Sequence, residues 1–149
     1  MTLYLIDINV WLAMTWDLHP QHAPAVRWYN ARGNCSLLFC RFTMLGFLRL
    51  LTNAKVMGDS ASDVRGALEL YDRWLEDPRV ELLPEPRGAE EAFRGALNPF
   101  GRQFATKAIA DCYLTAFASA AGAQLVTFDR ALASAARTGG VTATLIQAA

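Results

Sequence analysis

Short apolar runs alternate along the chain with longer segments in which apolar residues recur at helical spacing. The short runs predict strands buried on both faces, because such strands read as continuous hydrophobic stretches. The longer segments predict helices that pack on the sheet. Expected strands cover residues 3–6, 35–39, 80–83, 124–128 and 141–146, the last at a sheet edge, and expected helices cover residues 10–14, 23–31, 43–51, 89–97, 106–121 and 131–137.

Local signals mark the ends of several of these elements. Ser60 or Ser62 is expected to cap a further helix that runs to about Glu76, and Thr106 is expected to cap the helix that ends near residue 121. Residues 98–101 read as a loop, because Asn, Pro and Gly fall together there. The alternation of strands and helices predicts an α/β fold layered around a parallel sheet. With no repeat or linker in the sequence, we expect one domain over residues 1–149.

The composition is that of a globular domain with a small charged fraction. Hydrophobic residues make up 53% of the chain and charged residues 19%, below the roughly 25% of an average domain. The 14 basic and 14 acidic residues cancel, so the chain has no overall charge with which to hold duplex DNA. Any contact with nucleic acid must be local or depend on metal ions, which leaves an enzyme acting on RNA open.

The cysteines and the first residues favour a cytoplasmic protein. Cys35, Cys40 and Cys112 form an odd set without CxxC spacing, as expected for reduced thiols. No apolar run reaches the ~18 residues of a membrane span. The N-terminal segment has no basic stretch and meets Asp7 early, which is not typical of a signal peptide.

Three aspartates lie where a purely structural role is not an easy explanation. Asp7 and Asp129 each directly follow a predicted strand, and the carboxyl ends of parallel strands share the edge where ligands bind. Asp111 lies inside an apolar helix, where a carboxylate is costly unless a cation, a hydrogen-bond network or protonation compensates it. Taken singly, an aspartate after a strand is more often a turn former or a helix cap. Together the three predict one shared site.

Carboxylates grouped in this way favour a Mg²⁺ or Mn²⁺ ion. Hard cations prefer oxygen ligands, and Mg²⁺ takes one or two carboxylates while keeping waters and substrate phosphates. Such an ion can activate water beside a phosphodiester bond. The two histidines, His19 and His22, are expected to form a surface pair near a helix start. Cys112 is expected to be a small buried thiol rather than a nucleophile.

Three segments resemble the motifs of PIN domains, in the same order along the chain. They are LIDINV at residues 5–10, ADCYLTAFA at 110–118 and LVTFD at 125–129. A fourth segment, RFTMLGFLRLLTN at 41–53, is similar to a branch of VapC-like toxins that is rich in mycobacterial members. The ordered set, which spans nearly the whole chain, is far more specific than any one of its motifs.

The resemblance implies a three-layer α/β/α sandwich with a central, mainly parallel sheet. It also implies a Mg²⁺- or Mn²⁺-dependent endoribonuclease, the toxin of a type II toxin–antitoxin system that cuts structured RNA such as tRNA or rRNA and inhibits translation. The implied partners are a VapB-like antitoxin and a second copy of the chain, as a homodimer within a heterotetramer or larger assembly. The implied catalytic and metal-binding residues are Asp7, Asp111 and Asp129, supported by Asn9 and Thr127.

The chain departs from the family pattern at one position of the expected site. Many PIN domains carry a glutamate near position 44 or 46, where this chain has Met44 and Gly46. The pocket would then hold three carboxylates rather than four, which favours a single metal ion. The same gap keeps open an alternative, a catalytically weak PIN-like module that binds RNA or the antitoxin.

Basic residues near the expected site are candidates for contacts to RNA or antitoxin, because cations meet phosphates and acidic side chains. An ordinary surface role is at least as common for such residues. A receiver-like phosphoryl-transfer domain fits less well, since its late partner lysine has no clear counterpart. The candidate contact residues are Arg41, Arg49, Arg102 and Lys107.

Overall fold

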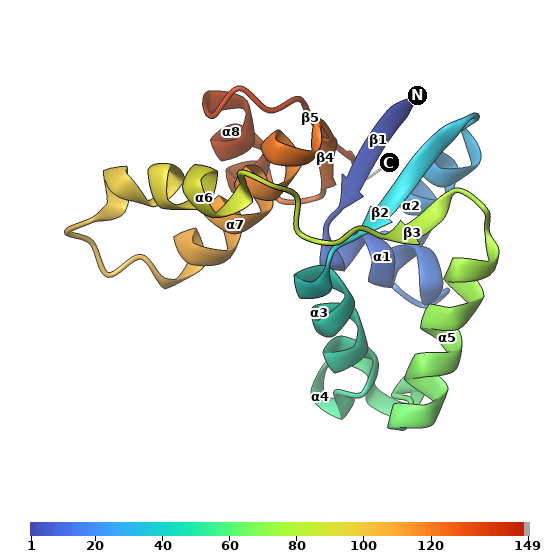
Figure 1. Cartoon of the computed structure of the whole chain (residues 1–149). Coiled ribbons are helices and arrows are strands. Elements are labelled where there is room, and N and C mark those ends of the chain that lie inside the picture. The colour runs from blue at the N-terminus through green and yellow to red at the C-terminus, as the bar shows by residue number, and fades with distance from the viewer. Residues whose placement is uncertain (148–149) are drawn as a thin grey trace.

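The computed structural model describes residues 1–147, and its centre is a sheet of five strands (Figure 1). The strand order is β3-β2-β1-β4-β5, and every neighbouring pair is parallel. β1 and β4 therefore lie side by side in the middle of the sheet, although they are far apart in sequence. The strands are β1 (Thr2–Ile6), β2 (Cys35–Phe39), β3 (Val80–Leu82), β4 (Gln124–Thr127) and β5 (Ala143–Leu145).

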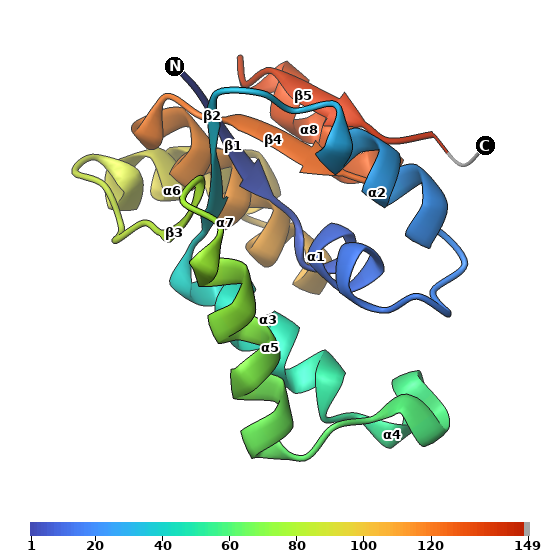
Figure 2. The ribbon, with the colours of Figure 1, turned by 90° about the vertical axis from the view of Figure 1, so that its right-hand side faces the viewer.

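Helices cover both faces of this sheet, so the chain forms three layers (Figures 1 and 2). The helices are α1 (Ile8–Thr15), α2 (His22–Asn30), α3 (Arg41–Leu51), α4 (Ala54–Met57), α5 (Val64–Glu76), α6 (Ala89–Leu97), α7 (Thr106–Ala121) and α8 (Arg130–Thr138). α1, α2, α3 and α5 pack around one hydrophobic core, and α7 and α8 pack around a second. α6 lies along α7. The predicted α/β/α sandwich is confirmed.

Alternate side chains of the central strands pack into the two cores on opposite faces of the sheet. In β1, Ile6 belongs to the first core and Leu5 to the second. In β2, Leu37 and Phe39 belong to the first and Leu38 to the second. Because helices cover both faces of these strands, the sequence shows continuous apolar runs instead of an apolar–polar alternation.

The predicted elements are confirmed with shifts of a few residues at their ends, but the predicted caps are wrong. α5 is capped by Asp63, whose carboxylate accepts the N–H of Gly66 at 2.7 Å, and neither Ser60 nor Ser62 takes that role. Thr106 is the first residue of α7 instead of its cap. Residues 98–100 form a 3₁₀ turn in place of the expected loop. The short α4 had no clear signal in the sequence.

The edge strand predicted for residues 141–146 is confirmed as β5, which pairs only with β4. The domain predicted over residues 1–149 includes residues 148 and 149, which lie outside the described part. Over the described residues, no helix has both the length and the apolar character that crossing a bilayer requires. Two of the candidate site residues, Asp7 and Asp129, lie just beyond the carboxyl ends of β1 and β4.

Candidate active site

Asp7 lies at the carboxyl end of β1 and begins α1. Its Oδ1 accepts the N–H of Ile8 at 2.8 Å, as an N-cap does. Its Oδ2 accepts the hydroxyl of Thr127, from the end of β4, at 2.7 Å. The carboxylate is thus fixed by hydrogen bonds from two elements, and within the described residues no basic side chain forms an ion pair with it.

Thr127 joins the two strand ends. Its side chain is completely buried, and its hydroxyl donates to Asp7 while accepting the N–H of Asp129 at 3.0 Å. Asp129 in turn caps α8 through Oδ1, which accepts the N–H groups of Ala131 at 2.8 Å and Leu132 at 3.2 Å. Its second oxygen, Oδ2, takes no part in the cap and instead contacts Lys107 Nζ. Asp129 can therefore cap α8 with one oxygen and face the candidate site with the other.

Asp111 reaches the same place from the middle of α7. Its side chain is only 18% exposed, and its Oδ2 accepts a bond from Lys107 Nζ at 2.9 Å, one helical turn earlier. The same Nζ lies 2.7 Å from Asp129 Oδ2. One ammonium group therefore bridges the carboxylates of α7 and of the β4–α8 junction. This is the cation that the apolar surroundings of Asp111 require.

The pKa shifts report the same arrangement. Burial raises the pKa of Asp7, and the negative charges of Asp129 and Asp111 raise it further, whereas the bonds from Thr127 and Ile8 oppose the rise. The bond from Lys107 lowers the pKa of Asp129. The two bonds to Asp129 and Asp111 raise the pKa of Lys107. The carboxylate of Asp7 thus lies within electrostatic range of both Asp129 and Asp111.

This set of donors suits a divalent cation. Lys107 Nζ occupies a cation position between Asp111 and Asp129, and Asp7 adds a carboxylate that lacks a cationic partner among the described residues. In their present positions no three His, Cys, Asp or Glu side chains of residues 1–147 gather closely enough to enclose an ion. Mg²⁺ needs only one or two direct carboxylates and fills its other positions with water. Asp7, Asp111 and Asp129 therefore fit such an ion.

α3, the helix that lacks the fourth acid, packs closely against the first residue of α1. A Cβ added to Gly46 would collide with Ile8 Cδ1 and lie 2.9 Å from Ile8 Cγ1. Met44 packs against the first core, and its sulfur accepts a bond from Arg41 at 3.3 Å. A side chain at position 46 would thus require the Ile8 side chain to move, and position 44 is taken up by packing.

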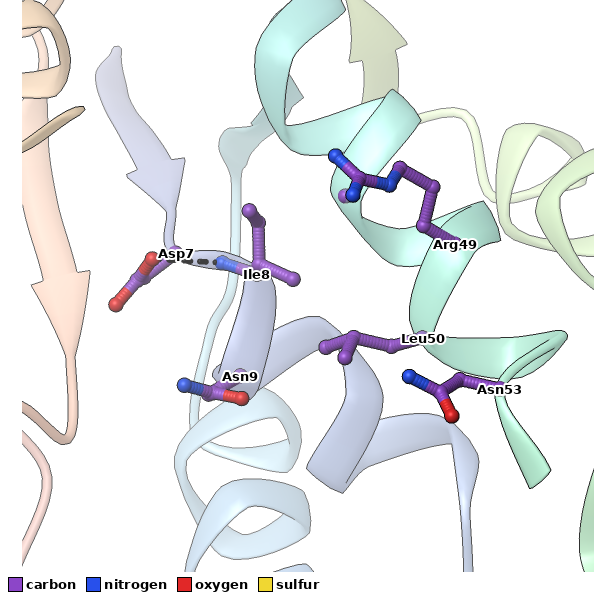
Figure 3. Close-up of a pocket in the computed structure, with 7 residues that line it drawn as sticks. Asp7, Ile8, Asn9, Arg49, Leu50 and Asn53 are labelled. Carbon is purple, nitrogen blue, oxygen red and sulfur yellow. Dashed lines mark hydrogen bonds between the residues drawn. The ribbon is translucent and has the colours of Figure 1, made fainter. Parts of the chain in front are cut away.

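A small cavity extends from Asp7 between α1 and α3 (Figure 3). It has a volume of about 370 Å³, and Ile8, Gly46 and Leu50 form its apolar part. Figure 3 shows the carboxylate of Asp7 pointing away from α3. The polar side chains that line the cavity besides Asp7 are Asn9, Arg49 and Asn53.

The comparisons with known proteins agree with this geometry. The PIN domain model matches residues 4–138. The chain belongs to the PIN-domain family. Within this family it is of the VapC type: it is 37% identical over 135 residues to Ribonuclease VapC41 of Mycobacterium tuberculosis, covering 85% of this chain and 89% of the relative.

Solved PIN structures share the fold. VapC20 of Mycobacterium tuberculosis, described as a sarcin–ricin loop cleaving toxin, aligns with a TM-score of 0.64 at 16% identity, over 89% of this chain and 94% of that one. VapBC2 of Rickettsia felis, solved bound to a DNA fragment from its promoter, aligns with a TM-score of 0.66 at 12% identity, over 98% and 100%. At these identities the likeness concerns the fold alone.

Of the other predicted contact residues, only Arg49 lines the cavity beside Asp7. Arg41 and Arg102 are exposed. Phe104 is fully exposed, so the loop before α7 presents an unburied aromatic ring. Lys107 differs from the others, because it is engaged with two acids. Its spacing of one helical turn from Asp111 was visible in the sequence, but its bond to Asp129 was not.

Two further expectations can be compared with the structure. The histidines are only partly exposed: His22 Nδ1 lies 2.6 Å from the carbonyl oxygen of Ala13, and His19 Nδ1 accepts the N–H of Gln21 at 3.0 Å. The prediction of a simple surface pair is therefore wrong, since both rings support the turn between α1 and α2. Cys112 is a buried free thiol whose pKa is raised by burial, as expected for a structural residue.

Proposed function

We propose that this PIN-domain protein is a metal-dependent endoribonuclease and the toxin of a type II toxin–antitoxin pair. The observation that carries the proposal is that contacts link all three aspartates, which come from three separate segments. Lys107 bridges the carboxylates of Asp111 and Asp129, and the Thr127 hydroxyl joins the Asp7 carboxylate to the backbone of Asp129. The ribonuclease relative supports the reaction class. Mg²⁺ or Mn²⁺ is the ion that carboxylate donors favour.

Each residue has a defined task in this proposal. Asp7, Asp111 and Asp129 hold the ion, which when bound lowers the pKa of water and neutralises charge on the scissile phosphate. Thr127 holds Asp7 and Asp129 at a fixed separation through its single hydroxyl. Asn9 lines the cavity at the same edge and offers an amide to the substrate or to the ion's water shell.

The surroundings of the acids are suited to RNA. Arg49 borders the cavity beside Asp7 and can meet a phosphate, while the exposed Phe104 offers a face on which an unpaired base can stack. The exposed Arg41 and Arg102 are further candidate contacts for RNA phosphates, whereas Lys107 is paired with Asp111 and Asp129. We propose a structured RNA, tRNA or rRNA, as the substrate, in keeping with the substrate named for VapC20.

The proposed partners follow from the same relatives. A VapB-like antitoxin would cover the acidic pocket, and the chain would form a homodimer within a larger cytoplasmic assembly. VapBC2 is an example of a related complex that binds its promoter. A purified complex is expected to release active toxin only when the antitoxin is removed.

A binding module without strong activity is the second candidate. The observation that favours it is the missing fourth carboxylate, since this chain has Met44 and Gly46 at the expected positions and Gly46 packs closely against Ile8. Cleavage separates the two candidates, because a binding module would retain RNA without cutting it.

The test is to incubate the antitoxin-free protein with total tRNA and rRNA, in Mg²⁺ or Mn²⁺ and then in EDTA. Asp111→Ala is the site variant, and Asp63→Ala, which removes only a helix cap remote from the pocket, is the control. We expect discrete cleavage that requires the ion, is lost in Asp111→Ala and persists in Asp63→Ala. Folded protein that cuts neither RNA with either ion would contradict the nuclease and favour the binding module.

A further inference from the structure

Lys107 is the one basic residue that contacts the acidic pocket within the described chain. Its Nζ lies 2.9 Å from Asp111 Oδ2 and 2.7 Å from Asp129 Oδ2. The first contact is within α7, but the second reaches a different element, so the lysine also links α7 to the β4–α8 junction. Surface ion pairs are generally weak, yet here one ammonium serves two acids that are largely shielded from solvent, being 18% and 34% exposed.

The charges of the pocket are consistent with a lasting role for this lysine. With all three aspartates ionised, Lys107 leaves two negative charges unbalanced, and one divalent ion neutralises them. PIN-type pockets with a fourth carboxylate would have more negative charge to offset. In this chain Met44 and Gly46 stand where the fourth acid would lie. The missing acid and the Lys107 ammonium therefore both reduce the negative charge that bound metal must balance.

We propose that Lys107 is a fixed cation of the pocket: it keeps its place between Asp111 and Asp129 when metal binds, so that the site takes one divalent ion instead of two. In two-metal sites a pair of ions about 3.5–4 Å apart shares the attacking and leaving oxygens. Lys107 supplies the positive charge that a second ion would bring, without needing ligands of its own. This inference rests on the proposed function, since it concerns the metal of the same site.

The first test measures whether the ammonium stays in place. The chain has two lysines, Lys55 and Lys107, so each can be followed separately by mass spectrometry after brief acetylation. Acylation needs a free amine, and the Lys107 side chain is 64% exposed, so the reagent can reach it whenever it leaves the acids. We expect Lys107 to react at least about tenfold more slowly than Lys55, with and without Mg²⁺. Asp111→Asn should speed its reaction.

The second test counts ions and measures their affinity by Mn²⁺ titration, followed by electron paramagnetic resonance. We expect one ion per chain in the wild type, and binding about tenfold or more tighter in Lys107→Met, because a neighbouring positive charge is lost. Lys107→Arg should behave as the wild type, and Lys55→Met is the control. In cleavage assays Lys107→Met should be slower despite its tighter metal binding.

Several results would overturn the proposal. Mg²⁺ could raise the acetylation rate of Lys107 to that of Lys55, which would mean that the ion displaces the ammonium. The wild type could bind two ions, or Lys107→Met could cleave faster, as expected if the lysine merely blocks the site. Acetylation and Mn²⁺ binding need no RNA. A protein that binds one ion with Lys107 protected, yet cuts no RNA, would refute the proposed function and leave this inference standing.

Discussion

Replacing Gly46 by alanine tests why the pocket has three carboxylates. An alanine in a helix interior is worth about 1 kcal/mol more than glycine. Here its Cβ would collide with Ile8 Cδ1 and lie 2.9 Å from Cγ1, and overpacking of this kind costs about 1–3 kcal/mol. We therefore expect Gly46→Ala to lower the free energy of unfolding by up to about 2 kcal/mol, despite the better helix former.

The partner residue makes the prediction sharper. In an Ile8→Ala background the collision is gone, so the same substitution should stabilise by up to about 1 kcal/mol. The coupling between the two sites should therefore be about 1–3 kcal/mol. Gly95 in α6 is the matched control, because an added Cβ there meets nothing within 4 Å, and Gly95→Ala should stabilise in either background.

Urea unfolding followed by tryptophan fluorescence measures these energies, since Trp11 of α1 is completely buried in the first core. The reasoning is refuted if Gly46→Ala stabilises the wild type as much as it stabilises Ile8→Ala. Ile8 would then move aside freely, and the absence of an acid at position 46 would need another explanation.

Three further predictions follow from the charges and bonds of the fold. Arg79 holds the pKa of Asp77 at about 2, so the pair stabilises the fold above pH 3.8, the unfolded value, and this stabilisation is lost as the pH falls toward 2. Asp77→Asn should lower the free energy of unfolding, measured by urea titration, by about 1–2 kcal/mol at pH 7 and by little at pH 2. Because the pKa of Asp7 is raised, its ionised form opposes folding above that pKa, and Asp7→Asn should raise the metal-free melting temperature at pH 7 while abolishing cleavage; a lower melting temperature would contradict this. Thr127→Val should lower the free energy of unfolding by about 1–3 kcal/mol. It should also move the acid limb of the cleavage–pH profile to higher pH, because the ionised form of Asp7 loses a hydrogen bond, and Thr127→Ser should restore both properties.

The acids of the site could be predicted from the sequence because their positions follow from topology. Asp7 and Asp129 each follow an apolar run, and parallel neighbouring strands bring their ends together wherever both runs are strands. Asp111 could be predicted because its helix is otherwise apolar. The order of the strands, and so the contact between Asp7 and Thr127, could not be predicted from any local pattern.

The remaining features depend on distances between elements, which the sequence does not encode locally. Lys107 reaches Asp129 only because α7 packs against β4 with its first turn beside the end of that strand. Gly46 is ordinary in sequence, and its meaning comes from how closely α3 approaches Ile8. The cap of α5 was assigned to a serine because three candidate caps lie close together there, and Asp63 is the one at the helix start.

Mn²⁺ binding by the three single variants Asp7→Asn, Asp111→Asn and Asp129→Asn tests the central claim most directly, namely that carboxylates from three segments hold one ion. We predict that each variant, still folded by circular dichroism, binds Mn²⁺ at least about tenfold more weakly than the wild type, since each loses a charged oxygen ligand. Wild-type affinity in any one of the three would remove that aspartate from the site and contradict the account.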